Sequence, residues 1–156
     1  MRECKAMTEL PHDVGSCSAL RQLSLPKCVS ITTLPESIGN LANLEDLILT
    51  KCKLLDSLPE SIGRCCALSL LDLRNCKKLV HLPVTLGQLQ ALRWLDVSTC
   101  KALKELPESV DHIKNLKHID VSNCLVLTGI PAAIISRMQS GEINVIGWEP
   151  KTDAEK

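Results

Sequence analysis

The sequence contains no Phe, no Tyr and only two Trp among its 156 residues. A core without large aromatic side chains must be filled by aliphatic residues, which supply most of the 45% apolar composition. Acidic and basic side chains balance at 18 each, so the chain lacks the pervasive positive field expected of a nucleic-acid-binding protein. It also lacks an apolar run near the ~20 residues of a membrane span. These absences favour one aliphatic domain and argue against nucleic acid as a partner.

Several signatures of other protein classes are missing as well. The first residues, Met-Arg-Glu-Cys-Lys, contain no apolar segment of a secretory signal peptide, and no Asn-x-Ser/Thr glycosylation site occurs. The nine cysteines are odd in number and form no Cys-x-x-Cys pair, which argues against both a disulfide framework and a zinc site. We therefore expect a reduced, cytoplasmic protein, with the nucleus as a second intracellular location.

What the sequence does contain is a repeat of 24 residues. The pattern Leu-x-x-Leu-x-Leu-x-x-Cys is clearest at residues 44–52 and returns without an insertion at 20–28 and 68–76, and at 92–100 and 116–124 with Val or Ile in place of some leucines. The cysteines in this frame are Cys4, Cys28, Cys52, Cys76, Cys100 and Cys124. A Leu-Pro pair follows each cysteine six residues later, with Ile130-Pro131 in the last copy. Such a period predicts leucine-rich repeats stacked as a solenoid.

Each repeat predicts one coil of an α/β repeat solenoid, a horseshoe fragment with a short parallel concave sheet. The alternating L-x-x-L-x-L stretch is typical of a short strand with one face inward. The return segment, for example residues 35–41, spaces its apolar residues by three, which predicts a short helical or 3₁₀ turn on the convex side. The cysteine between them is expected to be buried, with its S–H reaching a carbonyl of a neighbouring coil.

The frame also predicts the domain organisation. Residues 1–19 form a truncated first repeat, as expected of a fragment of a longer protein, and residues 20–131 form the regular repeats. Residues 132–150 form a capping coil, with a helix near 132–139 and a last strand near 143–145. Adding 24 to Ile119, Val121 and Cys124 places Ile143, Val145 and Trp148 in the same frame, so Trp148 would cover the cysteine row. Residues 151–156 read as a disordered tail.

Three cysteines lie outside the main row. Cys17 and Cys65 fall where other copies have Leu41, Leu89 or Ile113, so both are expected to point inward. Cys66 falls at a variable position and is expected at the surface.

The exposed strand positions predict a concave protein-binding face. Leu70, Trp94 and Ile48 would form an apolar group typical of interface hot spots, or a packing pair that only shields the sheet. Asp72, Asp96 and Asp120 would form an acidic row for a basic partner, or carboxylates that simply bond local N–H groups. The predicted protein-binding residues are Ile48, Leu70, Asp72, Arg74, Trp94, Asp96, His118 and Asp120.

A catalytic reading of the same face is weak. His118, Asp120, Ser98 and Ser122 could make a Ser-His-Asp arrangement, but an open sheet offers no water-excluded pocket. No Gly-rich phosphate loop occurs. We expect no enzymatic activity, no cofactor and no metal.

The repeat Leu-x-x-Leu-x-Leu-x-x-Cys-x-x-Leu-x-x-Leu-Pro-x-x-Ile-Gly-x-Leu, over residues 4–131, resembles the C-terminal repeats of plant intracellular nucleotide-binding immune receptors. The resemblance implies a recognition or autoinhibitory module. Its partners would be the receptor's own nucleotide-binding domain, a pathogen effector or a host signalling protein. The alternative is a stand-alone intracellular scaffold similar to the Ras-group-related leucine-rich-repeat proteins, which share the Leu-Pro-x-x-Ile segment.

Overall fold

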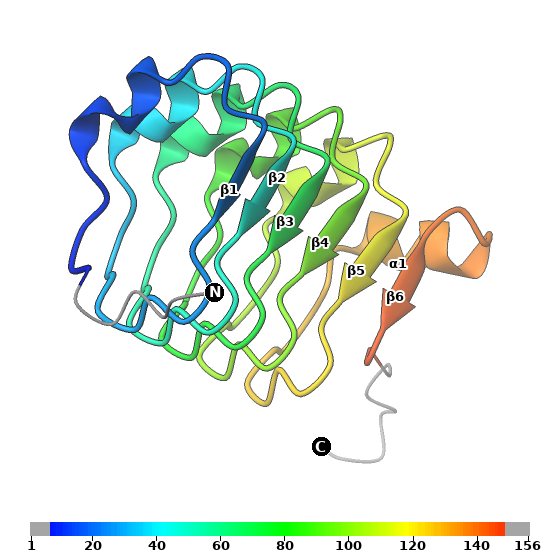
Figure 1. Ribbon diagram of the computed structural model, residues 1–156. Helices are drawn as coiled ribbons and strands as arrows, with labels where there is room; N and C mark the ends of the chain where they lie inside the picture. Colours follow the sequence, from blue (N-terminus) through cyan, green and yellow to red (C-terminus); the bar gives the residue numbers. More distant parts are fainter. Residues whose placement is uncertain (1–6, 149–156) are drawn as a thin grey trace.

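The computed structural model describes residues 7–148, and these wind into successive stacked coils of a solenoid (Figure 1). One side is a single parallel sheet of six strands in the order β1-β2-β3-β4-β5-β6. The strands are β1 Gln22–Ser24, β2 Asp46–Ile48, β3 Leu70–Asp72, β4 Trp94–Asp96, β5 His118–Asp120 and β6 Asn144–Ile146. The predicted parallel repeat sheet is confirmed.

Each strand has three residues, and their alternation sets the two faces of the sheet. The middle residue, such as Leu47, Leu71 or Leu95, is fully buried, while the first and third residues face outward. Side chains in a strand point alternately to opposite faces, so one leucine per strand enters the core. The remaining apolar positions of each repeat complete one continuous aliphatic core.

The return segments form 3₁₀ helices along the other side of the solenoid, as the spacing of three predicts. They are η1 His12–Ser16, η2 Glu36–Asn40, η3 Glu60–Arg64, η4 Val84–Gln88 and η5 Glu108–His112. Each begins directly after the repeat's proline, which cannot donate a backbone hydrogen bond. Neighbouring 3₁₀ helices touch along the stack, so the coils are joined on this side as well as through the sheet.

The cysteine ladder, which we define as Cys28, Cys52, Cys76, Cys100 and Cys124, runs between the sheet and the return segments. The Sγ atoms of Cys76 and Cys100 donate to the carbonyls of Leu49 and Leu73 at 3.3 and 3.1 Å. Cys52 and Cys124 do the same toward Leu25 and Val97. In each case the acceptor belongs to the preceding coil, so the expected thiol-to-carbonyl link is confirmed.

The last coil departs from the predicted frame. After η5 the chain forms the α-helix α1, Ala132–Gln139, and then β6. Strand β6 pairs Val145 with Ile119, an offset of 26 residues, so the prediction of Ile143 opposite Ile119 is wrong. An α-helix rises 1.5 Å per residue against 2.0 Å for a 3₁₀ helix, so it needs more residues to cross the same coil. Trp148 consequently lies two residues short of the ladder frame, although it still packs on the core as a half-buried side chain.

The burial of the three other cysteines agrees with the prediction for two of them and contradicts it for the third. Cys65 is fully buried and donates to the Ile38 carbonyl, and Cys66 is exposed, both as expected. Cys17, expected to be inward like Cys65, is exposed instead. It sits in the first described coil, where no other described coil covers its outer side. The predictions for Cys4 and for the tail 151–156 lie outside the described residues.

Candidate protein-binding face

The outward face of the sheet is built from the first and third residues of each strand. Strand register places Leu70, Trp94 and His118 side by side in one row. It places Ile48, Asp72, Asp96 and Asp120 in the second row. The sequence prediction that these residues share one face therefore agrees with the pairing, and the binding role of the face stays a prediction.

An aromatic pair lies at the centre of the first row. The rings of Trp94 and His118 are 4.7 Å apart between centroids and tilted by 33°. Leu70 is the register neighbour of Trp94 on the other side. All three side chains are partly exposed, so the row presents apolar surface while its members shield one another. The stack itself was not predicted, and the only signal for it was the 24-residue distance between Trp94 and His118.

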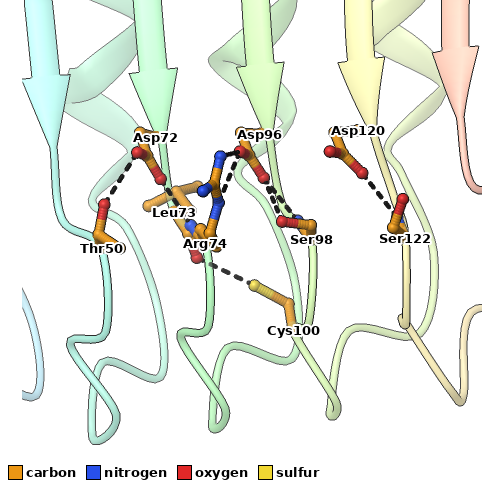
Figure 2. Close-up of polar contacts among 9 residues, drawn as sticks. All are labelled: Thr50, Asp72, Leu73, Arg74, Asp96, Ser98, Cys100, Asp120 and Ser122. Carbon is orange, nitrogen blue, oxygen red and sulfur yellow. Dashed lines mark hydrogen bonds and ion pairs between the residues drawn. The ribbon is translucent and has the colours of Figure 1, made fainter.

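The acidic row is held by hydrogen bonds of the chain itself (Figure 2). Asp72 accepts the Arg74 backbone N–H at 2.9 Å and the Thr50 hydroxyl at 2.8 Å. Asp120 accepts the Ser122 backbone N–H at 2.9 Å. This local bonding is the simpler of the two interpretations of the row, and it holds for every member.

Asp96 differs from its neighbours, because it is buried with 1% of its surface exposed. Its Oδ1 accepts the backbone N–H and the hydroxyl of Ser98 at 2.9 and 2.6 Å. Its Oδ2 accepts Nε and Nη2 of Arg74 at 3.0 and 2.6 Å. The prediction that Asp96 is an exposed contact residue is wrong, since the Arg74 guanidinium and Ser98 cover its carboxylate (Figure 2).

Arg74 is the cation that lies among the three carboxylates of the row. Hydrogen bonding to Asp96 raises the pKa of the Arg74 guanidinium, and the charges of Asp96, Asp72 and Asp120 act in the same direction. The cation offsets the repulsion expected between carboxylates on adjacent strands. About half of the Arg74 side chain, 53%, still faces solvent. Asp120 keeps one carboxylate oxygen without a hydrogen bond in the described part of the chain.

The histidine does not enter a catalytic arrangement. The Nδ1 atom of His118 is buried and has no hydrogen-bond partner in the described structure. Ser98 bonds to Asp96, and no hydrogen bond among residues 7–148 joins His118 to Ser98, Ser122 or Asp120. The geometry of a nucleophile, base and orienting acid is thus not assembled here.

Neither a metal centre nor a membrane-crossing helix is found in residues 7–148. Groups of three or more His, Cys, Asp or Glu side chains placed to hold an ion do not occur there. The helices in that range are all too short or too polar to cross a bilayer.

Comparison with solved structures gives the fold a broad set of neighbours. A leucine-rich-repeat protein from Leptospira interrogans is 27% identical, with a TM-score of 0.60 over 92% of this chain and 40% of its own. The leucine-rich-repeat domain of the type III effector XopL is 24% identical, with a TM-score of 0.67 over 89% of this chain and 56% of its own. The Toll–Spätzle complex from Drosophila is 23% identical, with a TM-score of 0.72 over 92% of this chain and 19% of its own.

The chain thus spans about half or less of the length of these neighbours. No curated protein sequence matches it significantly. Leucine-rich-repeat domains are generally non-catalytic modules for protein interaction. The family model that matches, described as "At1g61320/AtMIF1, LRR domain", covers residues 10–131, which is most of the repeat region. The chain therefore belongs to this plant leucine-rich-repeat family.

Proposed function

We propose that the chain is a non-catalytic recognition and regulatory module of a plant innate immune receptor of the intracellular nucleotide-binding class. It would act in the cytoplasm as the sensing or autoinhibitory part of that disease-resistance protein. Two observations support this: the match to a plant leucine-rich-repeat family and the Cys-bearing, Leu-Pro form of the repeat.

The observation that carries the proposal is the partly exposed row Leu70–Trp94–His118 on an open sheet face. A partly exposed Trp that packs against a neighbouring ring is a typical interface anchor. Next to it, Asp120 offers an unpaired carboxylate oxygen and Arg74 an exposed guanidinium. A partner surface with an apolar centre and charges at its margin fits this face, and Ile48 and Asp72 extend it.

The experiment measures binding of this module to the nucleotide-binding domain of its own parent receptor, added as a separate chain. Trp94→Ala should weaken that binding at least 30-fold, since hot-spot truncations cost more than ~2 kcal/mol. Val84→Ala is the matched control, because Val84 is an exposed apolar residue on η4, away from the sheet. If both variants weaken binding equally, or if Trp94→Ala leaves binding unchanged, the sheet face is not the binding surface.

The parent gene gives an independent test. A nucleotide-binding domain encoded upstream of this chain is expected. A parent that consists of leucine-rich repeats alone would instead favour an intracellular signalling scaffold of the Ras-group-related type.

A further inference from the structure

One edge of the solenoid is formed by five equivalent turns that follow strands β1 to β5. We call them the turn tips, and they are residues 27–30, 51–54, 75–78, 99–102 and 123–126. Each tip begins with a residue in the left-handed backbone region, with φ between 59° and 67°. The ladder cysteine that follows it anchors the tip to the core. The turns project beyond the arrowheads of the strands and form one continuous edge (Figure 1).

The turn tips carry charge of one sign only. Their six lysines are Lys27, Lys51, Lys53, Lys77, Lys78 and Lys101, and they contain no Asp or Glu. Because the whole chain is neutral, the remainder carries six more acidic than basic residues. The edge therefore carries a net positive charge, and the rest of the chain carries a net negative charge of the same size.

Three of these lysines form a row across consecutive coils. Lys53, Lys77 and Lys101 occupy the same position in three consecutive coils, whose strands lie about 4.8 Å apart. All are exposed, and none forms an ion pair with another described residue. The same is true of Lys51 and Lys78. A row of ammonium groups without counter-charges is suited to an extended anionic surface.

Exposed aliphatic side chains lie on the same tips. Leu125 and Val126 are 71% and 46% exposed, and Leu54 is 38% exposed. These are three of the five large apolar residues that the described structure leaves exposed. Leu54 lies in the same tip as Lys51 and Lys53, and Leu125 with Val126 lies at the C-terminal end of the row of tips.

Lysines together with exposed aliphatic side chains favour one class of anionic partner over another. Nucleic acid is bound by phosphate contacts together with aromatic or Arg stacking on bases, and the tips hold neither aromatic residues nor Arg. Protruding leucine and valine gain nothing from a phosphate backbone. At a lipid surface, however, lysines contact anionic headgroups while aliphatic side chains enter the interfacial layer.

We propose that the turn-tip edge is a peripheral docking surface for anionic phospholipid membranes. Lys53, Lys77 and Lys101 contact the headgroup phosphates, and Leu125 with Val126 inserts at one end. The bilayer plane lies across the ends of the strands, so the sheet face with Trp94 stays open to a protein partner (Figure 1).

The test is cosedimentation of the full 156-residue chain with vesicles. We expect the chain to bind vesicles of phosphatidylcholine that contain 30% phosphatidylserine and not to bind vesicles of phosphatidylcholine alone. Binding to the anionic vesicles weakens as salt rises. The triple variant Lys53→Gln, Lys77→Gln, Lys101→Gln lowers the partition coefficient about 100-fold, or about fivefold per lysine.

The matched control removes the same charge from the opposite edge: Arg93→Gln, Lys114→Gln, Lys117→Gln, all exposed residues that precede strands β4 and β5. It leaves vesicle binding within about threefold of the unmodified chain, apart from the general effect of net charge. No binding to anionic vesicles, or an equal loss in both triple variants, overturns the proposal.

A third variant separates lipid from nucleic acid. Leu125→Ser with Val126→Ser keeps every charge and lowers vesicle binding at least fivefold. A random-sequence oligonucleotide serves as the competing anionic ligand. If the chain binds the oligonucleotide as tightly as the vesicles, and the Ser variant binds both unchanged, the edge is a nucleic-acid surface and the membrane proposal is wrong.

Discussion

The ladder cysteines fill two needs with one side chain. The sulfur atoms occupy small apolar spaces in the core, and the thiols of Cys52, Cys76, Cys100 and Cys124 each donate to a carbonyl of the preceding coil. Burial raises the pKa of the Cys100 thiol to about 12, and that of the Cys65 thiol, which is buried outside the ladder, to about 11. Burial raises the pKa of Cys76 as well. Ionisation would place a charge in the core and remove the donated hydrogen, so the folded state holds these protons.

The first prediction concerns the pH dependence of stability. An ordinary thiol has a pKa of 9.0, while folded Cys100 ionises only near 12. Below pH 9 both states are protonated; above it the unfolded chain loses a proton that the folded chain keeps, so the free energy of unfolding falls. The loss from Cys100 is ~1.4 kcal/mol by pH 10. We expect Cys100→Ala to be less stable than the unmodified chain at pH 7.5. The difference between their free energies of unfolding should shrink by that amount at pH 10, because the variant has no thiol to ionise at this position.

Urea unfolding in the presence of a reductant, at pH 7.5 and pH 10, measures the two gaps. The chain has no tyrosine, so no phenol titrates in this window. Cys66→Ala serves as the control, because that thiol is exposed in the folded chain and should leave the gap unchanged. A Cys100→Ala gap that is the same at both pH values would show that the folded thiol ionises freely.

Single residues also mark where the repeat pattern stops being informative. Asp72, Asp96 and Asp120 are equivalent in the sequence, and the frame correctly places them in one row. The frame cannot predict how deeply each carboxylate is buried, because burial depends on the side chain that the preceding coil places next to it. The short Thr50 lies beside Asp72, whereas the long Arg74 covers Asp96. The candidate face was thus predictable in position, whereas its buried ion pair and the Trp94–His118 stack were not.

At the scale of the elements, close contact between return segments explains the repeated glycine of the 3₁₀ helices. The backbone of Gly87, in η4, lies against Ser109 of η5. A β-carbon at Gly87 would come within 2.7 Å of the Ser109 Cβ and closer still to its carbonyl oxygen. Any larger residue must push two coils apart.

The second prediction follows from that contact. Gly87→Ala should lower the free energy of unfolding by ~1–3 kcal/mol through overpacking. Gly129→Ala is the matched control, since a β-carbon there meets no atom within 4 Å, and its effect should stay within ~0.5 kcal/mol. Urea midpoints of the two variants provide the comparison, and equal midpoints would mean that adjacent coils separate at little cost.

The same elements show how far the period predicts the fold. Strands and 3₁₀ helices recur in frame from β1 to β5 because each coil has the same length and the same contacts with its neighbours. At the last coil the sequence predicted the helix at 132–139, and the structure contains it as α1. The register failed there because the helix type changes the number of residues per coil, and the period contains no information about that change.

Across the whole molecule, the coils contact their immediate neighbours and hardly anything else. Stability in such a stack is close to a sum of coil terms and nearest-neighbour terms. Ile134 of α1 is buried in the core, and Arg137, at a frame position where an apolar residue was expected, adds polar contacts between α1 and the preceding coil. Its guanidinium donates to the carbonyls of Asp111, Ile113, Lys114 and Leu116 at 3.2–3.5 Å.

The third prediction tests whether the stack frays from this end. Arg137→Ala removes a charged donor from several carbonyls, at a cost of ~1.5–3 kcal/mol. Because α1 and β6 contact only the coil before them, the loss should stay local: hydrogen exchange in residues 132–146 should accelerate about 10- to 100-fold, while residues 44–97 keep their protection. Exchange followed by mass spectrometry on peptides resolves the two regions.

Arg93→Ala is the control, because it removes an exposed arginine whose side chain has no hydrogen bond or ion pair in residues 7–148. It should change exchange in neither region. Equal acceleration throughout after Arg137→Ala would mean that the coils unfold as one cooperative unit, so that the terminal coil secures the sheet face and the turn tips of the entire molecule.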